Sequence, residues 1–184
     1  MINPRLHEKW ARRLGINPAV SRIVDKAIDK RQPDRAAHEV MLELADLRAK
    51  KKEDFDKAVI LHVLLDKLRD FLAWLLGEGG IKPIELLLKR GKAGLLLDVA
   101  KMLAIDTQRL GLNEMLLGLT PPKIDEVIEE LRQFAEELVR DILHELRLTS
   151  EAGKLRPGKR RRKYIRYVIN YVPELGEFID SRSL

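Results

Sequence analysis

The most apolar stretch of this chain is Glu53–Leu76, which reads EDFDKAVILHVLLDKLRDFLAWLL. Its apolar residues recur three and four positions apart, which is the period of an α-helix. They cover more than half of the helix circumference, so we expect this helix to be buried on most sides and to lie at the centre of the core. The residues that form this apolar surface are Phe55, Val59, Leu61, Leu64, Leu65, Leu68, Leu72 and Leu75.

The residues before this stretch also carry the start and stop signals of helices. Gly15 is expected to end a helix over Leu6–Leu14, and Asn17-Pro18 is expected to begin the next one. Asn caps the free backbone N–H groups of a helix, and Pro is tolerated in the first turn. A third helix is predicted after Gln32-Pro33. The apolar face predicted for the second helix consists of Val20, Ile23, Val24, Ala27 and Ile28.

After the central stretch, the longest helix is predicted over residues 121–148, where Thr120-Pro121-Pro122 forms the cap. Its acids are expected to face outward, and its apolar positions follow the helical period. They are Ile124, Val127, Ile128, Leu131, Phe134, Ala135, Leu138, Ile142 and Leu146. Other helices are predicted over Pro83–Lys89, Ala93–Leu103 and Lys159–Val172, with a last turn over Leu175–Ile179.

No alternating apolar and polar run bounded by hairpin turns occurs, so no sheet is predicted. The sequence therefore predicts an all-α fold, a bundle-like domain of roughly seven or eight helices with a basic helical appendage at its C-terminal end. We expect residues 1–148 to form the helical core domain. Residues 149–184 are expected to form a linker and the basic helix.

The composition excludes several classes of protein. The chain contains no cysteine, which rules out disulfide frameworks, cysteine zinc sites and thiol nucleophiles. Charged residues make up 35% of the chain, while Asn and Gln occur four and three times, a balance typical of proteins from hyperthermophiles. No apolar run approaches the ~18 residues of a membrane span, and the first residues do not resemble a signal peptide. We therefore expect a soluble, cytoplasmic protein.

A basic segment lies near the C-terminal end, where eight cations and no acid fall within residues 154–166. Phosphate oxygens neutralise such a run, and the release of counterions supplies the free energy of binding. Interleaved tyrosines offer rings on which bases stack if the rings face solvent. The nucleic-acid-binding residues expected from this pattern are Lys154, Arg156, Lys159, Arg160, Arg161, Arg162, Lys163, Tyr164, Arg166 and Tyr167.

Other interpretations of the same residues stay open. The tyrosines can instead pack in the core beside Ile165 and Val168, since tyrosine often packs among aliphatic residues. The basic segment can dock on the acidic outer face of helix 121–148 within the same chain. That acidic face can also bind a basic partner, in which case the protein is a protein–protein adaptor.

The histidines supply a pattern of a different kind. His62 and Asp66 lie one helical turn apart, a spacing that can serve a metal ion. The order of His7, His38-Glu39 and His62 resembles the metal-binding pattern of the HD-type phosphohydrolases, which are also all-helical. The resemblance covers residues 1–70, and it departs from the family where the defining His-Asp pair is His-Glu and where no downstream Asp motif occurs. It implies a metal-dependent phosphohydrolase built on His7, His38, Glu39, His62 and Asp66; otherwise these are ordinary surface or core residues.

Taken by itself, the sequence favours a non-enzymatic helical component of a nucleoprotein complex. Such a protein contacts the phosphates of DNA or RNA non-specifically through residues 154–166 and binds protein partners through other helical faces. In this interpretation no catalytic residue, metal or cofactor is predicted. There is also no Gly-Lys-Ser/Thr phosphate loop and no nucleophile elbow, which sets aside the P-loop NTPases and the α/β-hydrolases. The alternatives are the HD-like metal-dependent phosphohydrolase and the adaptor.

Overall fold

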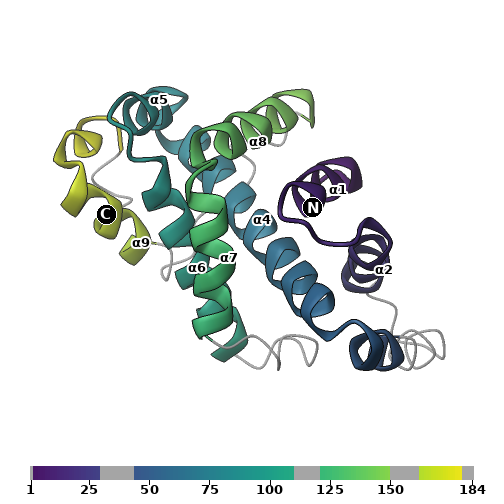
Figure 1. Cartoon of the computed structure of the whole chain (residues 1–184). Helices are drawn as coiled ribbons and strands as arrows, with labels where there is room; N and C mark the ends of the chain where they lie inside the picture. Colours follow the sequence, from purple (N-terminus) through teal and green to yellow (C-terminus); the bar gives the residue numbers. More distant parts are fainter. Residues whose placement is uncertain (1, 30–43, 110–120, 150–161, 180–184) are drawn as a thin grey trace. The chain divides into compact units, whose positions relative to one another are not determined.

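The computed structural model describes residues 2–29, 44–109, 121–149 and 162–179, and every regular element within these ranges is helical (Figure 1). The all-α class predicted from the sequence is therefore confirmed. No helix in the described ranges is long and apolar enough to cross a membrane.

The structure divides into two compact units. Unit 1 comprises Met1–Asp66 and Ala104–Leu131, and unit 2 comprises Lys67–Leu103 and Arg132–Leu184. In chain order, the helices are α1 (Pro4–Arg13), α2 (Pro18–Asp29), α4 (Lys52–Gly79), α5 (Lys82–Lys89), α6 (Ala93–Arg109), α7 (Pro121–Arg132), α8 (Ala135–Thr149) and α9 (Arg162–Tyr171), followed by the 3₁₀ helix η3 (Pro173–Glu177). Residues 44–50 are also helical.

The connection between α1 and α2 follows the signals seen in the sequence. Gly15 has a φ of 68°, the left-handed conformation that glycine adopts without strain, and it ends α1. The side chain of Asn17 accepts a hydrogen bond from the backbone N–H of Ala19 at 2.9 Å, so Asn17 caps α2 as predicted. Outside these caps, Glu8 of α1 pairs with Arg22 of α2 at 2.7 Å. The two helices contact each other.

Helix α4 is buried on most of its circumference, as its sequence predicted. Its first half supplies the core of unit 1 with Val59, Leu61 and Leu65, each at most 3% exposed. The same stretch also buries a histidine, His62, at 2% exposure. A polar ring at the centre of an apolar helix needs partners there, because burying an unsatisfied polar group costs about 1–3 kcal/mol.

Helix α9 belongs to unit 2, and the separate basic appendage expected at the C-terminal end is not confirmed. Tyr164, Ile165 and Val168 of α9 are each at most 3% exposed, so this face of the helix is part of a core. Helix α9 also contacts η3. The division of the chain into a core domain of residues 1–148 and a C-terminal part of residues 149–184 stays a prediction.

The prediction of a single long helix over residues 121–148 is wrong, because α7 ends at Arg132 and α8 begins at Ala135. Phe134, which was expected in the core, lies in the turn and is only half-buried. Neither Gln133 nor Phe134 is a helix breaker, and the apolar spacing continues through both. The break falls where the chain passes from unit 1 to unit 2, so tertiary packing overrides the local helix signal.

Candidate metal centre

Two histidines that are far apart in the sequence meet inside unit 1. The ring centroids of His7 on α1 and His62 on α4 are 4.4 Å apart, and their planes are inclined by 42°. Both side chains are 1% exposed. Because the rings lie against each other and are shielded from bulk water, their nitrogens need hydrogen-bond partners from the protein or a metal ion to ligate.

A buried carboxylate lies beside both rings. Asp25 of α2 places its Oδ1 atom 2.8 Å from Nδ1 of His62, within hydrogen-bond distance. The same oxygen is 3.3 Å from Nδ1 of His7, without hydrogen-bond alignment. Asp25 itself is 4% exposed. Oδ1 of Asp25 therefore lies beside the Nδ1 atom of each histidine.

A second carboxylate completes the group. Asp66 follows His62 by one turn of α4, and its Oδ2 atom is 3.5 Å from Nε2 of His62. Its other oxygen accepts a hydrogen bond from the backbone N–H of Ile2 at 3.1 Å. The Asp66 side chain is 29% exposed, so this end of the group reaches solvent. We call His7, Asp25, His62 and Asp66 the histidine cluster.

The spacing of the donors suits one metal ion. One ligating atom from each of His7, His62 and Asp66 lies within 4.8 Å of the other two. Two donors bound at ~2.1 Å in a tetrahedral site are about 3.4 Å apart, close to the distance found between His62 and Asp66. Two imidazoles with one carboxylate form a ligand set that zinc, iron and other divalent transition metals accept.

The electrostatics of the cluster also favour a cation. Burial, followed by the neighbouring His62, lowers the pKa of His7 to about 4, although Asp25 opposes the shift. His7 is therefore neutral at pH 7, and neutral imidazole is the form that ligates metals. Asp25 and Asp66 then leave negative charge in a poorly hydrated site. A dication would offset the carboxylate charge of the cluster, which reduces the cost of burying Asp25.

Part of this arrangement was predicted from the sequence and part was missed. His7, His62 and Asp66 are three of the five residues of the HD-like set, while His38 and Glu39 lie outside the described residues. Asp25 was missed because α2 was expected to bury an apolar face that includes Ile23. Ile23 is instead 38% exposed, and Asp25 is buried beside Val24.

Only part of the predicted nucleic-acid interface falls within the described residues. Lys154, Arg156, Lys159, Arg160 and Arg161 lie outside them. Within α9, three cations are exposed; we call Arg162, Lys163 and Arg166 the basic face of α9.

The tyrosines of α9 have different environments. Tyr164 is 2% exposed and belongs to the core, so the core interpretation holds for this residue. Tyr167 is half-buried, with its ring centroid 5.1 Å from that of Tyr171. Burial, the Asp98 carboxylate and Tyr171 raise the pKa of Tyr167 to about 12. Tyr171, the third of the interleaved tyrosines, is 57% exposed and offers the accessible ring.

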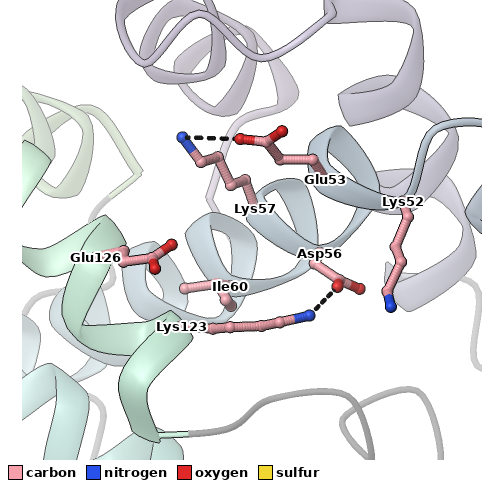
Figure 2. Close-up of a pocket in the computed structure, with 7 residues that line it drawn as sticks. All are labelled: Lys52, Glu53, Asp56, Lys57, Ile60, Lys123 and Glu126. Carbon is pink, nitrogen blue, oxygen red and sulfur yellow. Dashed lines mark hydrogen bonds and ion pairs between the residues drawn. The ribbon is translucent and has the colours of Figure 1, made fainter.

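A pocket of about 340 Å³ lies elsewhere in unit 1, between α4 and α7 (Figure 2). Its charges are largely paired: Lys123 contacts Asp56, and Lys57 lies 4.0 Å from Glu53. Lys57 also donates a hydrogen bond to Glu130 at 2.9 Å. Cations and acids occur in equal number among the residues of the lining, which are Lys52, Glu53, Asp56, Lys57, Ile60, Lys123 and Glu126. The pocket therefore selects no class of charged ligand.

Comparison of the chain with protein-family models, with curated proteins and with solved structures finds no match. The functional assignment therefore depends on the residues of this chain.

Proposed function

We propose that this protein binds one divalent transition-metal ion through His7, His62 and Asp66. The observation that carries the proposal is the position of His7. Its two ring nitrogens are buried and have no hydrogen-bond partner within the described part of the chain, and the ring lies against that of a second histidine at a tilt of 42°. A bound cation removes the cost of the unsatisfied nitrogen and balances the carboxylates beside it.

The reaction class that we propose for the bound metal is hydrolysis of a phosphate ester. A dication held by two imidazoles and a carboxylate lowers the pKa of a bound water to about 7, which supplies hydroxide at neutral pH. The partial exposure of Asp66 provides access from solvent. The same chemistry is implied by the resemblance of the histidine pattern to the HD-type phosphohydrolases.

Metal binding is tested by elemental analysis of the purified protein after incubation with zinc, manganese or iron and exhaustive dialysis. We expect about one ion per chain for the wild type. His62→Ala should lose this ion, whereas His144→Ala, which changes an exposed histidine of α8, should retain it. If the wild-type protein retains no metal after dialysis, the proposed metal-binding function is wrong.

The phosphohydrolase activity needs its own test. Hydrolysis of bis(p-nitrophenyl) phosphate should require the added metal and should disappear in His62→Ala. If the protein binds metal but shows no metal-dependent hydrolysis, the metal centre is structural and the proposed phosphohydrolase activity is wrong.

The second candidate function is non-specific binding of nucleic acid in the cytoplasm. The observation that favours it is the basic face of α9, where three neighbouring cations are all exposed. The five predicted cations of residues 154–161 precede this face directly in the sequence. A run of this length binds phosphates with a strong dependence on salt.

Charge reversal tests this second function. The triple variant Arg162→Glu, Lys163→Glu and Arg166→Glu should weaken binding to duplex and single-stranded DNA. It should also reduce the slope of log affinity against log salt by about 0.9 for each duplex phosphate that the protein no longer neutralises. The matched control reverses three exposed lysines on and after α5, Lys82, Lys89 and Lys92. An equal decrease in affinity in both triple variants would mean that overall charge, and not α9, governs binding.

A further inference from the structure

The two histidines of the cluster turn the same edge toward α2. Nδ1 of His62 is 2.8 Å from Oδ1 of Asp25, and Nδ1 of His7 is 3.3 Å from the same oxygen. In an imidazole, Nε2 lies on the opposite side of the ring from the group that Nδ1 contacts. For His62 that opposite side is where Asp66 lies.

We propose that Asp25 is the positioning residue of the metal centre, which holds both histidines with Nε2 directed to a single dication. The inference rests on the metal-binding function proposed above. Asp25 binds no metal itself in this arrangement. It acts through the two imidazoles, which makes it a positioning residue and not a ligand.

The physical reason is the choice of tautomer. A neutral imidazole carries one N–H, and its other nitrogen is the acceptor that ligates a metal. A carboxylate beside Nδ1 favours the proton there and leaves the lone pair on Nε2. The hydrogen-bonded carboxylate also makes the imidazole a more basic ligand. Since the Asp25 carboxylate lies beside both rings, removing it should weaken the orientation of two ligands at once.

The surroundings keep Asp25 in this position. It lies on the buried side of α2, at 4% exposure, and α2 contacts α1, in part through the Glu8–Arg22 pair. Its charge also completes the balance of the site. The carboxylates of Asp25 and Asp66 together match the charge of one dication, so the buried centre is neutral once the metal binds.

The test compares the Co²⁺ affinity of the wild type with those of Asp25→Asn and Asp25→Ala, measured by titration on the full chain. Asn keeps the shape of the side chain and removes its charge, and Ala removes the acceptor as well. We expect both variants to bind Co²⁺ roughly 10–100-fold more weakly, the usual effect of losing a carboxylate that orients a ligating histidine. Asp46→Asn, at an exposed carboxylate of unit 1, is the matched control and should bind as the wild type does.

Two further readouts separate positioning from a general effect on folding. Asp25→Asn should show a smaller rise in Tm on adding Co²⁺, because that rise depends on the affinity of the folded state alone. The visible absorption spectrum of its Co²⁺ complex should also change, since the ligands are held differently.

The outcomes distinguish this inference from the function on which it rests. If the wild type binds Co²⁺ and both Asp25 variants match its affinity and spectrum, the positioning role is wrong and the metal centre stands. If the wild type binds no Co²⁺, the proposed function fails, and the inference fails with it.

Discussion

The histidine cluster of unit 1 and the basic face of α9 in unit 2 are assembled in opposite ways. The cluster brings together residues from α1, α2 and α4 that span positions 7 to 66, and His7, Asp25 and His62 are almost fully buried. The basic face of α9 consists of near neighbours in the sequence, and all three side chains are exposed. A surface made by sequence neighbours can be predicted from the sequence, whereas a site made by packing can be predicted only in part.

The two regions also differ in the energetic cost of placing their polar groups. His7, Asp25 and His62 are almost fully buried, so their polar atoms must be satisfied by the protein or by an ion. The cations of the basic face of α9 are exposed to solvent, so they carry no comparable cost of burial. Variants in the two regions should therefore differ in whether they change stability or binding, and the following expectations run from the largest effect to the smallest.

The strongest effect on stability is expected within α9 itself. Tyr164→Ala removes a fully buried ring and should lower the free energy of unfolding by about 3–5 kcal/mol. Denaturant unfolding followed by circular dichroism measures this. Unchanged stability together with weaker binding of nucleic acid would show that Tyr164 is a surface residue, contrary to its burial here.

Leu68→Ala should come next. Leu68 is 1% exposed on the second half of α4, and its truncation leaves a cavity in the core of unit 2. We expect a loss of about 2–5 kcal/mol in the same unfolding measurement, with metal binding unaffected. A near-neutral result would mean that this half of α4 is peripheral.

Tyr171→Ala should affect binding more than stability, because Tyr171 is 57% exposed and its truncation removes only its contact with Tyr167. If bases stack on this ring, the variant should lose about 1–3 kcal/mol of affinity for single-stranded DNA. A fluorescence titration against a labelled oligonucleotide measures the loss. Equal affinity of variant and wild type would limit the interaction of α9 to phosphates.

The smallest effect is expected at the cap of α2. Asn17→Ala removes the hydrogen bond to the N–H of Ala19 and should cost about 1 kcal/mol of stability. Thermal unfolding measures this cost. Gln133→Ala, at an exposed turn position that caps nothing in the described structure, is the comparison variant and should have no such effect.

The fold was largely predictable because its signals are local. The helical period, the cap at Asn17 and the stop at Gly15 are each set by residues within a few positions of one another. The break between α7 and α8 was not predictable in this way. Gln133 and Phe134 carry no local stop signal, and the break depends on which unit each helix packs in.

The candidate metal centre was predictable only in part for the same reason. The spacing of His62 and Asp66 on one helix can be read from the sequence, but the contact between His7 and His62 depends on how α1 packs on α4. Asp25 gave one available signal, an acid next to the apolar Val24 on α2. Whether Asp25 is buried depends on which face of α2 packs in the core. The predicted apolar face included Ile23, which is exposed in the structure.

The most direct test of the account is anomalous X-ray scattering at the zinc edge from crystals of the full chain grown with zinc. We expect one strong peak at ~2.0–2.2 Å from a nitrogen of His7, a nitrogen of His62 and an oxygen of Asp66, with Asp25 beside the rings and not bound to the ion. An anomalous map with no peak at this cluster, or with zinc only at surface residues such as His144, would contradict it.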